Sequence, residues 1–281
     1  MKRIALLVAF AVLLSSQAQA GTWLKSLTAA QKKAKESNSL IFVDMFAQWC
    51  GWCHRFEAEV FPSQAFQNAT DDLVLLRLDT EDGNEGTKLS QKFGITSLPT
   101  FLLLTPDLTI AGIIRGYAPP AEFATMLGQT RGKYTDFQMR VKNEASIAGD
   151  YQKRLDLARE FMSRGDYAAS EPRLKKLLDE KKAAAAVRDQ AHYELAVGYV
   201  LQKKYPDAMT TINKLTARSK SGEPVERARL LVAQIYMDQG NLAAAATEFR
   251  KFKQSFPNSP LVKNVDQVLP EIEKRIAAGA R

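Results

Sequence analysis

Both cysteines of this 281-residue chain, Cys50 and Cys53, lie in one short segment, WCGWCH at residues 49–54. A secreted protein that depends on a structural disulfide framework has more cysteines, spread widely along the chain. Here every thiol belongs to one tight motif. The roughly 260 residues that follow residue 20 are enough for two domains of ordinary size, each with its own core.

Residues 1–20 have the pattern of a signal peptide. A positive start, Lys2-Arg3, precedes an unbroken apolar run of eleven residues, Ile4–Leu14, and small residues follow at positions 18 and 20. A membrane-spanning helix needs about twenty apolar residues, so an uncleaved anchor is the less favoured alternative. We expect cleavage before Gly21 and export into a bacterial periplasm.

Residues 21–130 alternate between helical and strand patterns. Helices are predicted at 23–37, from the cysteines through residue 61, at 85–93 and at 119–129, with strands at 40–46, 73–78, 100–104 and 109–114. Strands that alternate with helices pair in parallel, and the closing hairpin adds an antiparallel edge. We therefore expect an α/β domain with a mixed sheet flanked by helices, followed by a linker or short bridging helix at 131–147.

Residues 148–281 contain no strand pattern and are predicted to be helical throughout. Breaks at Gly165-Asp166, Lys203-Lys204 and Gly240-Asn241 are 38 and 37 residues apart, and small and aromatic residues recur at matching positions before them. This pattern resembles the tetratricopeptide repeat, whose unit is two antiparallel helices. The resemblance implies an all-α helical-repeat domain with a capping helix at 258–278. A helical bundle with chance periodicity is the alternative.

Charge is distributed unevenly between the two parts. Residues 21–150 carry 13 Lys and Arg against 15 Asp and Glu, whereas residues 151–281 carry 24 against 16. A basic second part could attract acidic partners or a membrane surface. The alternative that we favour is a solvated, lysine-rich helical surface. We expect no nucleic-acid partner for an exported protein.

The cysteines follow a buried strand and begin a helix, which is a placement that favours redox chemistry. A helix N-terminus stabilises a thiolate, so Cys50, which we expect to be exposed at that terminus, is the predicted nucleophile. Cys53, one turn further, is close enough to attack a mixed disulfide and release the product. A zinc site needs three or four ligands, and only His54 and the distant His192 could add to the pair. A cysteine hydrolase needs a histidine across a cleft. We expect neither a metal nor a cofactor.

Three segments resemble the thioredoxin family: VDMFAQWCGWC at 43–53, GITSLPT at 94–100, and Gly116. The resemblance covers about residues 38–130 and implies a thioredoxin-like fold in which the helix from Trp23 replaces the usual first strand. It also implies a cis peptide bond before Pro99. Leu98, Pro99 and the two tryptophans of the motif, Trp49 and Trp52, are then expected to border the groove in which a substrate chain docks.

The same resemblance assigns supporting roles to Asp44 and Arg77. The family places a buried acid at the position of Asp44, where it accepts the proton of the second cysteine, and often a lysine at the position of Arg77. A purely structural ion pair is the alternative. Trp52 stands where the family commonly has proline and adds contact surface. His54 either adds positive charge at acidic pH or points into solvent.

Together these features predict an exported thiol–disulfide oxidoreductase that reduces or exchanges disulfides in periplasmic client proteins. The repeat domain is expected to recruit a peptide or protein, and a membrane donor to supply electrons. The alternative is a protein-interaction scaffold or chaperone-like adaptor whose thioredoxin-like domain is not catalytic. The residues between the cysteines do not fix the direction of electron flow, and the sequence leaves open the clients, the repeat ligand and the oligomeric state.

Overall fold

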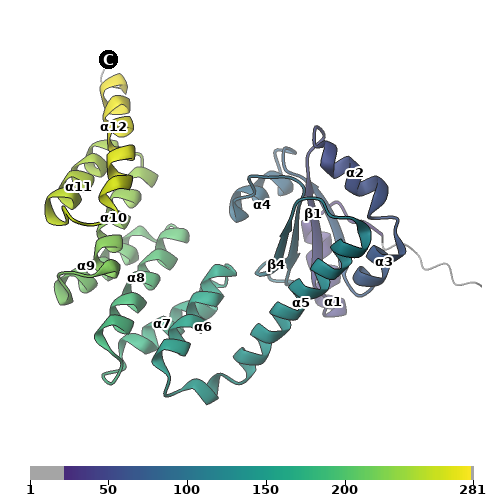
Figure 1. Cartoon of the computed structure of the whole chain (residues 1–281), viewed down its shortest axis with the longest axis horizontal. Helices are drawn as coiled ribbons and strands as arrows, with labels where there is room; N and C mark the ends of the chain where they lie inside the picture. The colour runs from purple at the N-terminus through teal and green to yellow at the C-terminus, as the bar shows by residue number, and fades with distance from the viewer. Residues whose placement is uncertain (1–21, 280–281) are drawn as a thin grey trace, which may run out of the picture. The chain divides into compact units, whose positions relative to one another are not determined.

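A computed structural model describes residues 22–279 (Figure 1). The chain divides between Gly132 and Lys133 into two compact units, which we call the first and second units. The signal peptide expected at residues 1–20 lies outside the described residues. Among the helices of residues 22–279, none is long and apolar enough to cross a membrane.

The first unit is built around a four-stranded mixed sheet with the strand order β2-β1-β3-β4. Strand β1 is parallel to β2 and antiparallel to β3, and β3 is antiparallel to β4. The elements in chain order are α1 (Leu27–Ser37), β1 (Ile41–Phe46), α2 (Gly51–Glu59), α3 (Gln64–Thr70), β2 (Val74–Asp79), α4 (Glu85–Phe93), β3 (Thr100–Leu104), β4 (Ile110–Arg115) and α5 (Pro120–Lys142).

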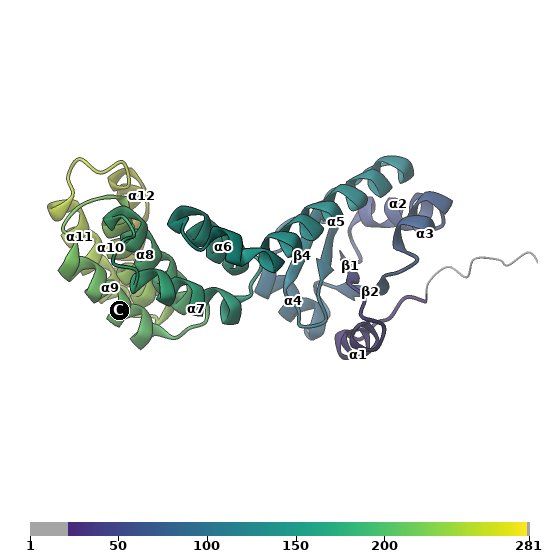
Figure 2. The same ribbon diagram turned by 90° about the horizontal axis from the view of Figure 1, so that it is seen from below.

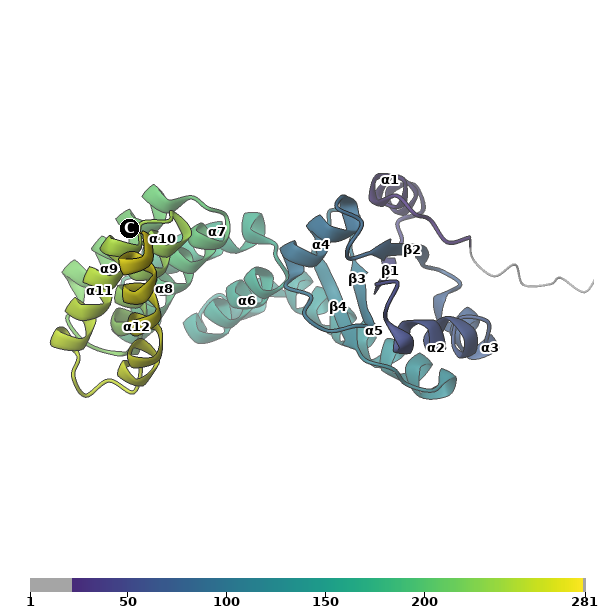
Figure 3. The ribbon, with the colours of Figure 1, turned by 90° about the horizontal axis from the view of Figure 1, so that it is seen from above.

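Helices cover both faces of this sheet, with α1 and α4 on one face and α2, α3 and α5 on the other (Figure 3). Side chains of a strand alternate between faces. Val43 and its odd-numbered neighbours pack against Ala34 of α1 and Leu89 of α4. Phe42 faces the other way, 5.5 Å from the ring of Phe66 and 6.1 Å from that of Phe123. Strand β1 is therefore buried on both faces, which its apolar sequence predicts.

The expected α/β fold is confirmed, but its first elements differ from the prediction. Helix α1 begins at Leu27 rather than Trp23, because Ser26 caps it by accepting a hydrogen bond from the Ala29 N–H. Leu24 instead forms a single parallel β-bridge with Leu76 of β2. The helical segment predicted through residue 61 ends at Glu59, and α3 forms a separate helix that the sequence pattern did not reveal.

Helix α5 continues to Lys142, well beyond the predicted end at residue 129. Its last turns, in the second unit, carry Tyr134, Phe137 and Val141 at helical spacing, and these side chains pack with Leu157 and Phe161. A short 3-10 helix, η1 (Glu144–Ile147), follows. Much of the segment 131–147, for which we expected a linker or short bridging helix, thus contributes apolar side chains to a small core.

In the described part of the second unit, three helix pairs and a last helix, α12, follow the end of α5 and η1 (Figure 2). The first helices of successive pairs are neighbours: α6 contacts α8, and α8 contacts α10. Helix α12 packs on α11. This confirms the expected helical repeats. The bounds are α6 (Tyr151–Ser163), α7 (Tyr167–Leu178), α8 (Ala185–Leu201), α9 (Tyr205–Arg218), α10 (Glu223–Asp238), α11 (Leu242–Ser255) and α12 (Val262–Gly279).

The turn inside each helix pair has the same backbone structure. Gly165, Lys203 and Gly240 occupy equivalent positions with φ of 76°, 58° and 76°. Each donates its N–H to the carbonyl three residues earlier, at 2.8–2.9 Å. The next residue is the N-cap of the second helix. Its side chain caps that helix at Asp166 and Asn241 but not at Lys204. The second repeat therefore lacks both the glycine and the cap of the other two.

We expect the double substitution Lys203→Gly, Lys204→Asp to stabilise the protein. Left-handed backbone costs a residue with a side chain about 1–2 kcal/mol, partly offset by the larger chain entropy of unfolded glycine. A new aspartate cap adds about 1 kcal/mol. The net gain is about 1–2 kcal/mol, or roughly 3–6 °C in melting temperature followed by circular dichroism. Gly165→Lys, the opposite change in the first repeat, should lower it. An unchanged or lower melting temperature of the double variant would contradict the assignment of Lys203 and Lys204 to the glycine and cap positions of the repeat turn.

Candidate functional site

Cys50 and Cys53 form a disulfide bond at the N-terminus of α2. Cys50 is the cap residue of this helix, and its Sγ accepts a hydrogen bond of 3.1 Å from the N–H of Cys53. The N–H of Cys50 donates to the carbonyl of Ala47, one residue beyond the end of β1. The short connection from a buried strand to a helix start thus places the sulfur of Cys50 at the helix N-terminus, within hydrogen-bond distance of the Cys53 N–H.

The disulfide is enclosed by apolar side chains. Cys50 is 3% exposed and Cys53 2% exposed, and both pack with Ala47, Phe46 and Leu98. The exposure that we expected for Cys50 is therefore wrong for the disulfide form. The position at the start of a helix predicted an exposed Cys50. Leu98, from a loop far along the chain, packs against the pair and helps to bury it.

That loop has the backbone that the resemblance implied. The Leu98–Pro99 peptide bond is cis. The carbonyl of Pro99 accepts a hydrogen bond of 2.9 Å from the N–H of Gly116, which follows β4 and has a φ of 83°. A side chain is disfavoured at this φ, which accounts for glycine at position 116. Leu98, the first residue of this cis peptide bond, packs against the disulfide.

Two exposed aromatic side chains flank the disulfide. Trp49 is 69% exposed and donates from Nε1 to Glu81 at 2.8 Å, and Trp52 is 55% exposed. The ring of Trp52 lies 5.4 Å from that of Tyr117, and the guanidinium of Arg55 lies 5.6 Å and 4.8 Å from these two rings. Sequence reasoning missed Tyr117, although its position directly after Gly116 was a signal that could have found it.

Asp44 is a buried carboxyl group on the same face of β1 as Phe46, the face covered by α2. It is 2% exposed, and its Oδ2 lies 3.0 Å from Nε of Arg77, its register partner on β2. The contact is an ion pair without the alignment of a hydrogen bond. Burial raises the pKa of Asp44 to about 7, although Arg77 acts to lower it and Glu57 to raise it further.

Glu57 of α2 is a site residue that sequence reasoning missed. Its Oε2 accepts a hydrogen bond of 2.8 Å from Arg77, so Arg77 bridges two carboxyl groups. Hydrogen bonding from Arg77 lowers the pKa of Glu57. Glu57 and Arg77 line a cavity of about 420 Å³, together with Phe46 and His54. The cavity gives solvent access to the ion pairs beside Asp44.

The two histidines each contact a backbone carbonyl. Nε2 of His54 lies 2.8 Å from the carbonyl oxygen of Gln48, so its ring folds back over the turn that precedes the cysteines. Nδ1 of His192, in the second unit, lies 2.9 Å from the carbonyl oxygen of Arg188. Within residues 22–279, no three His, Cys, Asp or Glu side chains gather as metal ligands.

Comparison with protein families decides what the first unit is. Residues 27–131 match the thioredoxin-like domain. The first unit is a thioredoxin-like domain. Residues 155–224 and 215–260 match the tetratricopeptide repeat, so the helix pairs of the second unit are tetratricopeptide repeats. The chain is thus a fusion of the two, as the sequence patterns indicated.

Relatives with names of disulfide-interchange proteins and thioredoxins each match part of this chain. The thiol:disulfide interchange protein DsbD of Pasteurella multocida is 37% identical over 73 residues, which are 26% of this chain and 13% of that protein. Thioredoxin H2 of Arabidopsis thaliana is 34% identical over 80 residues, 28% of this chain and 56% of that protein. The oxidised C-terminal domain of Neisseria meningitidis DsbD is 18% identical with a TM-score of 0.35, and covers 39% of this chain and 100% of its own.

Proposed function

We propose that this chain is a thiol–disulfide oxidoreductase that acts through Cys50 and Cys53. The observation that carries the proposal is the disulfide at the N-terminus of α2, packed against Leu98 of the cis Leu98–Pro99 bond. The match of residues 27–131 to the thioredoxin-like domain supports the proposal, as do the partial matches to relatives named for thioredoxin and disulfide interchange. The matches cover 13% of the Pasteurella multocida DsbD and 56% of the Arabidopsis thaliana thioredoxin H2. The activity of those relatives is therefore a proposal for this chain.

The proposed reaction begins from the reduced pair. The thiolate of Cys50 attacks one sulfur of a client disulfide, forming a mixed disulfide and releasing the other client sulfur as a thiolate. The helix N-terminus and the N–H of Cys53 stabilise the Cys50 thiolate before attack. Cys53 then attacks the Cys50 sulfur of the mixed disulfide. The client leaves with two thiols. The two electrons that it gained come from Cys50 and Cys53, which are oxidised to a disulfide.

Asp44 is the proposed proton acceptor for this second step. Cys53 attacks as a thiolate, so its proton needs a base, and a carboxyl with a pKa of about 7 accepts protons effectively near neutral pH. Asp44 lies on the sheet face that α2 covers, and the cavity beside Arg77 and Glu57 provides a route for the proton to solvent. Trp49, Trp52, Leu98 and Pro99 are the proposed contacts for the client chain.

The proposal places this chemistry in the periplasm, on the signal-peptide pattern of residues 1–20. There the clients are disulfide-containing proteins, and a reducing role needs electrons from a membrane donor. The tetratricopeptide repeats recruit a peptide or protein, which raises the effective concentration of a client near Cys50 without new chemistry.

Equilibration with glutathione tests the proposed reducing or exchanging role. We expect the fraction of reduced Cys50–Cys53, followed by thiol alkylation and mass, to give a reduction potential below about −150 mV, toward the values of known reducing thioredoxins. A protein with that potential should also reduce insulin in the presence of dithiothreitol. A potential above about −150 mV would contradict the reducing role and indicate an oxidase. No measurable exchange with glutathione would contradict the oxidoreductase proposal itself.

A further inference from the structure

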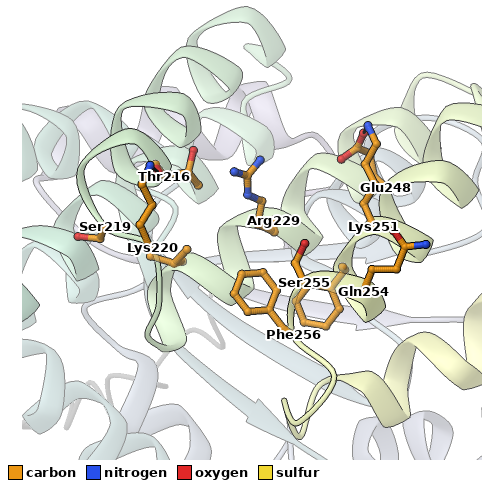
Figure 4. Close-up of a pocket in the computed structure, with 11 residues that line it drawn as sticks. Thr216, Ser219, Lys220, Arg229, Glu248, Lys251, Gln254, Ser255 and Phe256 are labelled. Carbon is orange, nitrogen blue, oxygen red and sulfur yellow. Dashed lines mark hydrogen bonds and ion pairs between the residues drawn. The ribbon is translucent and has the colours of Figure 1, made fainter.

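A second pocket lies in the repeat domain, between the C-terminal ends of α9 and α11 and the start of α10. Its volume is about 340 Å³. Figure 4 shows Arg229 of α10 in the middle of this pocket, with Lys220 on one side and Lys251 on the other. All of these residues belong to the second unit. We call it the α9–α11 pocket.

Arg229 is a cation without a partner. Within the described part of the chain, its side chain makes no hydrogen bond, ion pair or ring contact. In contrast, Arg227, two residues earlier on the same helix, is paired with Glu223 at 2.8 Å. Nζ of Lys220 donates to the carbonyl of Thr216 at 2.9 Å, which holds its charge at the pocket wall. The pocket therefore presents a free guanidinium beside a second, fixed cation.

The third cation of the pocket is neutralised in place. Nζ of Lys251 lies 2.7 Å from Oε1 of Glu248, the carboxylate among the lining residues. Removing that carboxylate would leave three cations around one pocket. Two aromatic rings complete the wall: Phe252 is buried, Phe256 is half-buried, and their centroids lie 5.3 Å apart. An occupant thus meets positive charge on one side and an apolar surface on the other.

We propose that the α9–α11 pocket binds an acidic peptide segment, with a Glu or Asp carboxylate on Arg229 and a neighbouring apolar side chain against Phe256. A guanidinium binds a carboxylate through two parallel hydrogen bonds, which makes an unpaired arginine a good receptor for this group. The pocket can hold one or two side chains, and the excess of 24 basic over 16 acidic residues in 151–281 attracts an acidic chain at longer range.

The inference deepens the proposed recruiting role of the repeats and rests on it for its biological meaning. Its test does not depend on redox chemistry, because binding is measured directly. If the chain reduces disulfides but binds no acidic peptide, the pocket inference fails and the oxidoreductase proposal stands. If it binds the peptide and shows no thiol exchange, the reverse holds.

The probe is a fluorescein-labelled octapeptide of alternating Glu and Leu, titrated with the full chain in buffer of about 0.15 M ionic strength, where charges beyond about 8 Å are screened. We expect a saturable rise in anisotropy, and binding at least about tenfold weaker for Arg229→Gln, since a charge-assisted hydrogen bond is lost. Glu248→Gln should instead strengthen binding severalfold, because it frees Lys251.

Arg227→Gln is the matched control, since it removes the same charge from the same helix outside the pocket. It should leave binding within about twofold of the unaltered chain, because only long-range attraction is changed. A peptide in which Gln replaces Glu should bind at least about tenfold more weakly. Equal weakening by Arg229→Gln and Arg227→Gln would overturn the proposal. So would equal binding of the Gln peptide, or displacement by about 10 mM inorganic phosphate, which adds little screening and would indicate a small-anion site.

Discussion

Cys50→Ser is expected to abolish disulfide reduction, to the level of a reaction without protein. Cys50 is the helix cap whose Sγ receives the N–H of Cys53, and the chain has no third cysteine to replace it. Serine in its place cannot form a mixed disulfide with a client. The measurement is insulin reduction with dithiothreitol as the electron source, followed by turbidity. Retained turnover would show that Cys50 is not the attacking thiol.

Cys53→Ser is expected to fail differently, and the contrast tests the roles of the two cysteines. Cys50 of this variant still attacks, but nothing resolves the mixed disulfide, so covalent complexes with clients accumulate. These complexes are visible on non-reducing gels and disappear with reductant. The double variant Cys50→Ser, Cys53→Ser is the control for non-covalent capture. Equal trapping by both single variants would contradict the assignment, because trapping requires a nucleophile that one of them lacks.

Local sequence signals predicted the parts of the fold that depend on neighbouring residues. The run Ile41–Phe46 is apolar and β-branched enough to form a strand buried on both faces. The repeat turns were found because Gly165 and Gly240 fill positions that need left-handed backbone. The redox pair was found because its spacing and placement are themselves the chemical signal.

The parts that were missed depend on side chains brought together from distant positions. Leu98 encloses Cys50, so burial of the pair is invisible to the motif alone. Glu57 and Arg77 are twenty residues apart and meet because α2 lies over β2. The apolar stripe of Tyr134, Phe137 and Val141 covers about two turns, and its helical spacing gains meaning through the partners on α6. In each case the residue can be read from the sequence, but its contact depends on the tertiary fold.

Asp44→Asn should make the protein more stable above pH 7 and less active. Burial raises the pKa of Asp44 from an ordinary value near 3.8 to about 7. The folded protein therefore binds a proton that the unfolded chain has lost between about pH 4 and 7, and the free energy of unfolding falls as the pH rises through this window. A shift of about three units corresponds to an upper limit of about 4 kcal/mol at pH 8.

Asparagine carries no charge to bury, so its advantage should be about 2–4 kcal/mol at pH 8 and should vanish at about pH 3, where Asp44 is mostly protonated in both states. Urea unfolding at the two pH values measures this difference. Asp107→Asn, at an exposed carboxylate paired with Lys35, is the control and should change stability by less than about 1 kcal/mol at either pH.

In the Asp44→Asn variant, release of client from the mixed disulfide should slow by about a hundredfold or more near pH 7, since asparagine cannot accept the proton of Cys53. Lower stability at pH 8 together with unchanged release would identify the pair of Asp44 and Arg77 as a structural ion pair. A gain in stability that accompanies a loss in rate is the signature of a carboxyl group retained for its chemistry, because burying its charge weakens the fold.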